Sequence, residues 1–318
     1  MGAWEHVISG TYSISVHDYE VKVKQEKDSN GKPVKEKIEW ITPVGTLSQA
    51  KEYIPQAFTW AYKEYPVKNI KELEILRFIY EHQEVKQVSD EGQKKLMGVY
   101  GKWGVGSSAP PRNPMVSLFV EWMGVVNTIY ALMDAPEEVE KTLEVISRIF
   151  DPIFDAICSA PAPLVCFGDN ITGEVVSPKI FEKYYAPHYR KYTPGLRKAG
   201  KYSLVHIDGT MRGILPLVSR TGIDCGQSLT PAPVGDVEVE EMRKLAGPDL
   251  ILAGGVPGAF FSPVFPRKAL EDIVMRCLKH YKNDGKFMLC VCDQVPPDAE
   301  IDRVKMVSDL VEKYGRVG

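Results

Sequence analysis

The sequence predicts an α/β protein, a (β/α)8 TIM barrel with an N-terminal β-hairpin and a helical extension. From residue 164 onward, short apolar runs alternate five times with longer amphipathic segments. Strands and helices that alternate in this way form a parallel sheet. A chain of 318 residues favours closure of that sheet into a barrel, which takes roughly 250 residues, over an open sheet. We therefore expect a single barrel domain over residues 1–318, with residues 1–78 as its decoration.

The N-terminal segment carries strand and turn signals of its own. Residues 12–23 alternate apolar and polar side chains, a pattern that is typical of a half-exposed strand. The cluster Ser-Asn-Gly-Lys-Pro at 29–33 predicts a turn before a second strand at 38–41. We expect an exposed hairpin outside the barrel wall, as a lid near the barrel mouth or at a subunit contact. A helix is predicted over residues 68–84.

The five strand–helix units that follow have clear boundaries. Strands are expected at residues 164–170, 202–206, 223–228, 249–253 and 287–292. Their helices are expected to begin near residues 177, 211, 239, 266 and 298. In the first helix, Ser177 predicts the N-cap and Pro178 the first helical residue, because a hydroxyl acceptor and a residue without an N–H suit these two positions.

Composition and charge restrict the class of protein. Apolar residues make up 44% and charged residues 25% of the chain, as in ordinary globular proteins with a large core. The net charge of -3 gives no field that would recruit nucleic acid or an anionic membrane. The first residues lack a basic region followed by an apolar stretch, and no window approaches the roughly 20 apolar residues of a membrane span. We therefore expect a cytoplasmic protein whose six cysteines are reduced thiols, mostly buried by packing.

Polar side chains gather where the predicted strands end, and a barrel carries its active site at these carboxyl ends. The residues concerned are Asp169, Asn170, His206, Asp208, Gln227, Cys290 and Cys292. Side chains two residues apart on a strand share a face, so His206 with Asp208 and Cys290 with Cys292 are expected to point into the barrel mouth. Imidazole and thiolate suit zinc, and a catalytic zinc keeps three protein ligands and one open position. His206 and Cys292 are the first two expected ligands, while Asp208, Cys290 and Asp169 remain alternatives for the third.

Two further patterns have plainer explanations. Gly254-Gly255 lacks the rest of any phosphate-binding motif and predicts a tight turn. Four tyrosines at helical spacing are expected mainly to pack a helix against the barrel; they are Tyr184, Tyr185, Tyr189 and Tyr192. Of these, Tyr184 is also a candidate substrate contact, together with Asn170 and Gln227.

From about residue 117 to the C-terminus, the chain resembles the uroporphyrinogen decarboxylase superfamily. The resemblance depends on motifs in a fixed order, namely Gly-Asp-Asn at 168–170, a Ser-Pro helix start at 177–178, His-Ile-Asp-Gly at 206–209, Ala-Gly-Gly-Val-Pro at 253–257 and Cys-Asp-Gln-Val-Pro-Pro at 292–297. True decarboxylases of this superfamily hold a porphyrinogen with an arginine-rich N-terminal segment. Arg77 is the only arginine in the first hundred residues here, so the resemblance argues against that activity.

The methyltransferase branch of the superfamily has zinc on a His-x-Cys element and on a later Cys that precedes a proline. His206 and Cys292 match the outer ligands, while Asp208 stands where members that methylate thiols have Cys. The resemblance therefore implies methyl transfer from a small methylated substrate, an aryl methyl ether by preference, to the cobalt of a separate corrinoid protein. It gives Asp169 the role of orienting the substrate or of general acid, and Asp208 a place at the catalytic metal.

Two alternatives remain open at this point. One is a zinc-dependent methylcorrinoid:thiol methyltransferase, and the other is a metal-free barrel that binds a ligand without turnover. Zinc and a cobalamin-type corrinoid supplied by a partner protein are the expected cofactors. The pattern also leaves a homodimer open.

Overall fold

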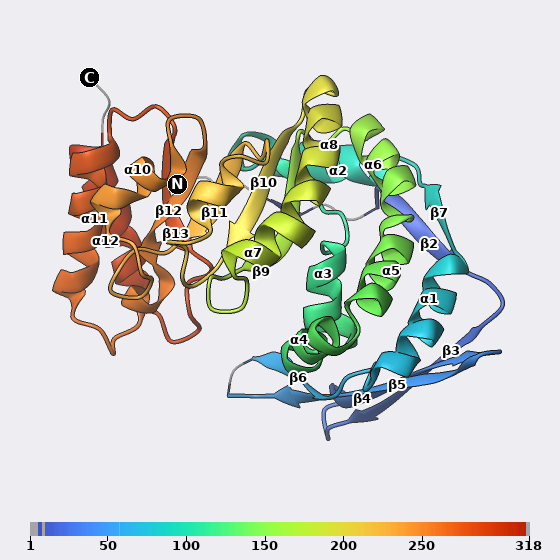
Figure 1. The fold of residues 1–318 in the computed structure, drawn as a ribbon. Coiled ribbons are helices and arrows are strands. Elements are labelled where there is room, and N and C mark those ends of the chain that lie inside the picture. The colour runs from blue at the N-terminus through green and yellow to red at the C-terminus, as the bar shows by residue number, and fades with distance from the viewer. Residues whose placement is uncertain (1–5, 8–9, 57, 316–318) are drawn as a thin grey trace. The chain divides into compact units, whose positions relative to one another are not determined.

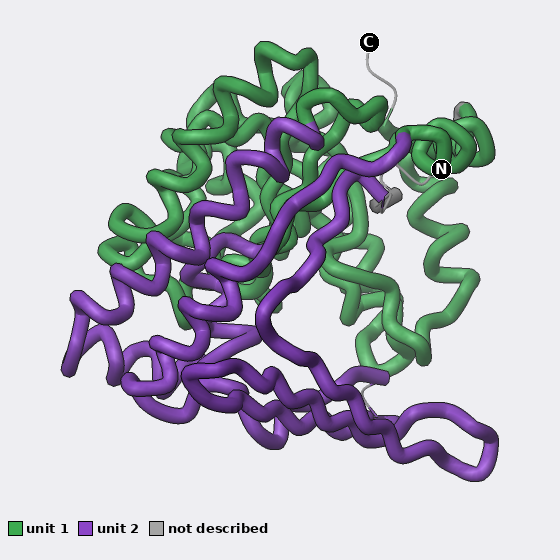
Figure 2. The backbone as a smooth tube through the Cα atoms, turned by 90° about the vertical axis from the view of Figure 1, so that its right-hand side faces the viewer, with its two compact units in different colours: residues 1–9, 90–111, 158–318 green, residues 10–89, 112–157 purple. Residues whose placement is uncertain are grey.

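The computed structural model describes residues 6–7, 10–56 and 58–315. The chain forms two compact units (Figure 2), which are described one after the other. Unit 1 comprises residues 1–9, 90–111 and 158–318, and unit 2 comprises residues 10–89 and 112–157. The prediction of one domain over residues 1–318 stays a prediction.

Unit 1 contains a parallel sheet of seven strands, visible in Figure 1, which pair in sequence order. The strands are β1 (His6–Val7), β8 (Gly106–Ser108), β9 (Leu164–Ile171), β10 (Tyr202–Ile207), β11 (Cys225–Leu229), β12 (Ile251–Pro257) and β13 (Phe287–Cys292). Strands β9 to β12 are largely apolar and buried, as expected of a parallel sheet that is covered on both faces, whereas β13 is apolar but mostly half-buried. The predicted α/β architecture with a parallel sheet is therefore confirmed.

Closure of this sheet into an eight-stranded barrel is not seen in the described residues. There, β1 and β13 are the two ends of the row, and no strand pairing joins them. The prediction of closure depended on chain length alone, which carries no information about pairing between the first and last strands. The coarser prediction, parallel strand–helix units in series, does not depend on closure.

Five such units follow one another from residue 164 to residue 314, as predicted. Their main helices are α8 (Ala186–Lys198), α9 (Leu215–Val218), α10 (Met242–Ala246), α11 (Arg267–Tyr281) and α12 (Ile301–Tyr314). Shorter turns are α7 (Pro178–Ile180), a π-helical turn η4 (Phe181–Tyr185), and the 3-10 turns η5 (Val239–Glu241) and η6 (Gly258–Phe261). Ser177 caps α7 as predicted, because its side chain accepts a hydrogen bond from the Ile180 backbone N–H. Before β9, unit 1 also contains α2 (Glu91–Tyr100) and the 3-10 turn η2 (Gly101–Trp103).

The interior of the sheet is a layer of small and sulfur-containing side chains. Leu204 is paired in register with Cys166 on one side and Cys225 on the other, and these three pack with Ala253. Leu164, Ile251 and Cys290 pack against the same cluster. The packing roles predicted for Cys166 and Cys225 are therefore confirmed.

Unit 2 contains two antiparallel sheets and a set of helices. One sheet pairs β3 (Glu20–Lys27), β4 (Pro33–Thr42), β5 (Gly45–Ile54) and β6 (Thr59–Glu64), and the other pairs β2 (Tyr12–Val16) with β7 (Gln83–Gln87). The helices are α1 (Leu73–Glu81), which follows the 3-10 turn η1 (Ile70–Glu72), α3 (Pro114–Ser117), the π-helical turn η3 (Leu118–Trp122), α4 (Val125–Asp134), α5 (Pro136–Ser147) and α6 (Phe150–Ser159), whose last two residues belong to unit 1. Figure 1 shows α1 lying along the four-stranded sheet, whose strands β4 and β5 it contacts.

The predicted N-terminal hairpin exists, but it is shorter than expected. Strands β3 and β4 form it around a turn in which Asp28 accepts hydrogen bonds from the backbone of Asn30 and Lys32. The hairpin belongs to a sheet of its own, separate from the parallel sheet, as predicted. Residues 12–16 do not belong to it, because Asp18 adopts a left-handed φ of 63° and β2 pairs with β7 instead. Its placement at the mouth or at a subunit contact stays a prediction.

The helix predicted over residues 68–84 is also shorter than expected. Asn69 caps η1, and α1 ends at Glu81. The next residues form β7, whose pairing with β2 is a long-range contact that local periodicity cannot show. In the part of the chain that the structure describes, no helix has both the length and the apolar character needed to cross a membrane.

Candidate functional site

The polar residues predicted from the sequence lie at the carboxyl edge of the unit 1 sheet. Asp169 and Asn170 lie near the end of β9, His206 near the end of β10 and Gln227 within β11. Asp208 directly follows β10, and Cys292 is the last residue of β13. Because all these strands are parallel, their carboxyl ends share one edge, where α/β proteins bind ligands.

This edge contains several strained backbone positions. Asn170, Ser228 and Asp293 have left-handed φ values of 45°, 68° and 62°, and they lie at or just beyond the ends of β9, β11 and β13. A left-handed residue other than glycine costs roughly 1–3 kcal/mol and typically marks a functional site. Ser228 and Asp293 support each other, since the Asp293 backbone N–H donates to the Ser228 hydroxyl at 2.6 Å. The left-handed conformations of Ser228 and Asp293 were not predicted, because residue type alone does not show which turn residue takes a positive φ.

His206 is fixed in one tautomer by its neighbour on β11. Its Nδ1 lies 3.0 Å from the Gln227 side-chain oxygen, and His206 and Gln227 are register partners. Because an amide oxygen can only accept, Nδ1 carries the hydrogen, and Nε2 of the neutral ring keeps its lone pair. That Nε2 atom is buried and has no hydrogen-bond partner among the described residues. The nearest acidic atom is Oδ1 of Asp293, at 4.0 Å.

Asp169 forms the second part of this edge. Its carboxyl group is buried, with the residue only 3% exposed, and its Oδ2 accepts a hydrogen bond from the Tyr189 hydroxyl at 2.6 Å. Burial first, and then the Asp169 charge, raise the pKa of both Tyr189 and Tyr185 well above its ordinary value. Tyr189 therefore stays protonated and can hold the carboxylate in place.

The other predicted substrate contacts and tyrosines have different surroundings. Tyr185, Tyr189 and Tyr192 are buried, which confirms that they pack helix α8 and the turn before it. Tyr184 is half-buried, with the Lys183 ammonium 5.1 Å above its ring. Asn170 is exposed. Their contact with a substrate stays a prediction.

The two cysteines of β13 do not share one environment. Cys292 is buried, and its thiol donates to the Leu229 carbonyl at 3.1 Å. Burial raises the pKa of Cys292 to about 12, and the Asp208 charge adds a smaller increase. Cys290 instead packs against the interior cluster of the sheet. The predicted convergence of Cys290 and Cys292 on the barrel mouth is therefore not what the structure shows, because Cys290 belongs to the core layer below.

These contacts show how far each residue of the predicted zinc site could act as a metal ligand. Among residues 6–7, 10–56 and 58–315, no three His, Cys, Asp or Glu side chains are grouped closely enough to hold a metal ion as they stand. His206 nevertheless fits a ligand, since its Nε2 lone pair is buried and unpartnered while Nδ1 is held by a neighbour. Cys292 fits by chemistry, provided that its thiol loses its proton and leaves the Leu229 carbonyl.

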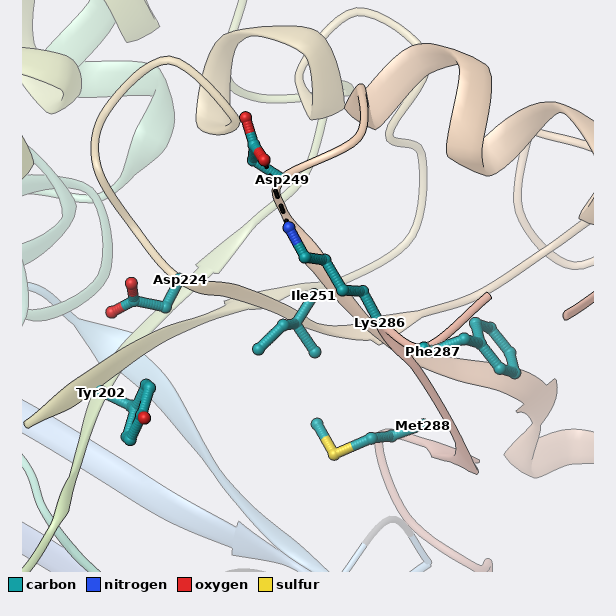
Figure 3. A pocket seen from close by; sticks show the side chains of 8 residues that line it. Tyr202, Asp224, Asp249, Ile251, Lys286, Phe287 and Met288 are labelled. Atoms are coloured by element: carbon teal, nitrogen blue, oxygen red, sulfur yellow. Dashed lines mark hydrogen bonds and ion pairs between the residues drawn. The ribbon is translucent and has the colours of Figure 1, made fainter. Parts of the chain in front are cut away.

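A separate cavity of about 250 Å³ lies at the opposite, amino-terminal edge of the same sheet (Figure 3). Tyr202, Ile251 and Phe287, the first residues of their strands, line it. Its charged groups are already paired: Lys286 with Asp249 at 3.2 Å, and Asp224 with Arg197 at 2.8 Å. We assign this cavity to the stability of the strand starts, as is usual at that face.

Comparison with known proteins places this geometry in context. The family model described as uroporphyrinogen decarboxylase (URO-D) matches residues 116–314. No curated protein matches the sequence. Among solved structures, a methyltransferase from Methanosarcina mazei is similar, with a TM-score of 0.60 and 14% identity over 84% of this chain and 75% of that chain. At this identity the likeness shows the fold alone. A 3-dehydroquinate dehydratase from Geobacillus kaustophilus matches with a TM-score of 0.30 and 16% identity over 78% of this chain and 77% of that chain, and it carries no argument.

Proposed function

The chain belongs to the uroporphyrinogen decarboxylase family, and from that premise we propose that it is a methyltransferase rather than a decarboxylase. The surroundings of Arg77 support this choice. The Arg77 side chain forms an ion pair with Glu138 at 2.9 Å and a hydrogen bond to Thr142 at 3.0 Å, and it is buried between α1 and α5. It is therefore committed to a structural contact, so the first hundred residues offer no free guanidinium group for a polycarboxylate.

The observation that carries the proposal is the orientation of the His206 ring, in which Nδ1 is hydrogen-bonded and Nε2 is left for a ligand. A half-buried histidine whose Nδ1 is held by Gln227, and whose buried Nε2 has no hydrogen-bond partner among the described residues, matches the first ligand of the methyltransferase pattern. We infer that His206 and Cys292 hold zinc, and that the sheet closes into the family's barrel around this edge. The methyltransferase from Methanosarcina mazei, whose fold is similar, supports methyl transfer as the activity.

The proposed reaction removes a methyl group from an aryl methyl ether. The carbon–oxygen bond breaks, a carbon–cobalt bond forms on the reduced corrinoid of a separate protein, and the departing phenolate oxygen gains a proton. Bound zinc would supply Lewis-acid stabilisation of that oxygen. Asp169, held by Tyr189, would orient the substrate or deliver the proton, and Asp208 would assist at the same edge. Asn170, Tyr184 and Gln227 are the proposed substrate contacts.

A methyl-transfer assay tests this function. Purified protein is mixed with reduced cobalamin and either an aryl methyl ether or a methylated thiol, and methylcobalamin formation is followed by absorbance. We expect turnover with the ether, and a loss on the order of 10²-fold or more in His206→Ala, as for removal of a catalytic group. Turnover with the methylated thiol alone would favour the thiol methyltransferase. A metal-free protein that binds either compound without turnover would be a ligand-binding barrel.

A further inference from the structure

The buried apolar cluster of the unit 1 sheet marks one face of the sheet, which we call the cluster face. Three members of the cluster come from neighbouring strands, and they are Cys166 of β9, Leu204 of β10 and Cys225 of β11. Side chains two positions apart on a strand share a face. The next residues on the cluster face, one step closer to the carboxyl edge, are therefore Gly168, His206 and Gln227. The contact between His206 Nδ1 and the Gln227 side-chain oxygen agrees with this placement.

The residue before Gly168 shows which way the glycine faces. The ring of Phe167 packs edge-on against the ring of Tyr189 in α8, with their centroids 5.3 Å apart. Phe167 therefore faces the helix layer, so Gly168 faces the opposite side, which is the cluster face. Phe167 is also the register partner of Val205, so Gly168 and His206 directly follow one register pair on two neighbouring strands.

The backbone does not require a glycine at position 168. Its φ is not left-handed, and the left-handed residue of the register shift in β9 is Asn170. Among the described residues other than its two chain neighbours, no atom lies within 4 Å of a Cβ built on Gly168. A glycine inside a strand lowers stability, and it typically marks a bulge or the close approach of a backbone or a ligand. Because Asn170 accounts for the bulge and no backbone approaches, a ligand is the remaining explanation.

The cluster face opens to solvent at Gly168. Cys166 is 9% exposed, Gly168 is half-buried, and Asn170, a proposed substrate contact, is exposed. The space at Gly168 therefore lies between an apolar floor and the polar residues of the carboxyl edge. Small-molecule sites combine mainly apolar surface with a few polar groups, so this arrangement suits an aromatic ring that carries one oxygen.

We propose that the substrate ring lies against the bare backbone of Gly168, so that residue 168 sets the largest ring that the site accepts. The inference rests on the proposed function for the aromatic character of the substrate. It does not depend on a metal ion, because the contacts involved are apolar contacts with Gly168 and with the cluster below it.

Binding of phenol and 2-naphthol, demethylated products with one and two rings, tests this inference without corrinoid and without turnover. Calorimetric titration gives the dissociation constant of each compound for the wild type and for Gly168→Ala, which places one methyl group in the open space. We expect Gly168→Ala to weaken 2-naphthol binding by roughly tenfold or more, and phenol binding by less than about threefold. Gly168→Val, with a larger side chain, should weaken phenol binding by roughly tenfold as well.

Gly226→Ala is the matched control. Gly226 precedes Gln227 on β11 and lies on the other face of that strand, where a Cβ meets side-chain atoms of Ile207 and Leu250 at 3.5 Å, an ordinary contact. This variant should bind both compounds as the wild type does. Urea denaturation of Gly168→Ala checks that weaker binding does not come from a folding defect, and this variant alone decides the outcome if Gly168→Val does not fold.

Equal weakening of both compounds in Gly168→Ala, or no weakening of either, would overturn the inference, and methyl transfer by the wild type would then leave the proposed function intact. A wild-type chain that binds neither compound would overturn it as well. A loss that grows with ring size, in a protein without methyl transfer, would support the inference and refute the proposed function.

Discussion

A single amide oxygen determines which nitrogen of His206 is available at the carboxyl edge. The sequence placed His206, Asp169 and Cys292 at strand ends, because polar residues after apolar runs are visible locally. It assigned Gln227 to the substrate and did not anticipate its contact with His206. That contact depends on the register of β10 against β11, which only the paired sheet defines.

Replacing Gln227 tests whether its side-chain oxygen orients the His206 ring. In Gln227→Met the Nδ1–H of His206 loses its partner, so the ring can rotate or change tautomer. We expect zinc affinity to fall by about 10–100-fold, the usual effect of losing an outer-shell partner. Gln227→Glu retains an acceptor oxygen and should preserve most of the affinity, as measured by chelator competition. Equal loss in both variants would point to a role in packing alone.

At the scale of elements, the local alternation of apolar and polar residues predicted where strands and helices lie, but it did not predict which strands pair. The alternation after residue 164 predicted the five strand–helix units, because both the strands and the amphipathic helices leave local signals. The pairing of β2 with β7 joins residues about seventy positions apart, so periodicity could not reveal it. Closure of the sheet belongs to the same class of long-range property.

A substitution at Gly254 tests how closely strands β11 and β12 approach each other. A Cβ at Gly254 would lie 2.6 Å from the backbone N and O of Leu229, and Gly254 has a φ of 155°. Backbone atoms cannot move aside as a side chain would, so we expect Gly254→Ala to lower the free energy of unfolding by at least about 3 kcal/mol. Gly168→Ala is the control on β9, where a Cβ meets nothing within 4 Å, and it should change stability by less than about 1 kcal/mol. Urea denaturation measures both, and similar values would contradict the close approach.

At the scale of the whole molecule, the chain crosses repeatedly between its two units. Unit 2 is assembled from residues 10–89 and 112–157, and the family model, which begins at residue 116, includes parts of both units. Prolines mark two of these crossings, Pro110 and Pro111 at one and Pro161 and Pro163 just after another, but such short runs also occur in loops within one domain, so the division was not predicted.

Alkaline pH should destabilise the whole molecule in a defined window. Burial raises the pKa of Cys277 from its ordinary 9.0 to about 12. Its contribution to stability is therefore complete below about pH 9 and is lost as the pH rises towards 12, because the thiol ionises in the unfolded chain and stays protonated in the folded one. Half-buried Tyr80 and buried Tyr281, whose pKa values are also raised to about 12, act in the same direction.

We expect the free energy of unfolding, measured in urea from pH 8 to pH 11, to decline above about pH 9. The decline should be shallower in Cys277→Ala, which has no thiol to ionise at that position. The slopes of the free energy of unfolding against pH are compared, rather than its absolute values, because the smaller side chain lowers stability by the same amount at every pH. Parallel curves for the two proteins would show that Cys277 titrates alike in the folded and unfolded states.

The π-helical turn at Phe181–Tyr185 has an evolutionary consequence for Asp169. A π turn arises when one residue is inserted into an α-helix, and proteins usually retain such insertions at functional positions. Deletion of that residue would rotate the flanking helix by about 100°, the angle between successive α-helical residues, and would withdraw the Tyr189 hydroxyl from Asp169. The inserted residue and the buried acid should therefore be inherited together, so that lineages with a one-residue gap in this turn should also have replaced the carboxylate at position 169.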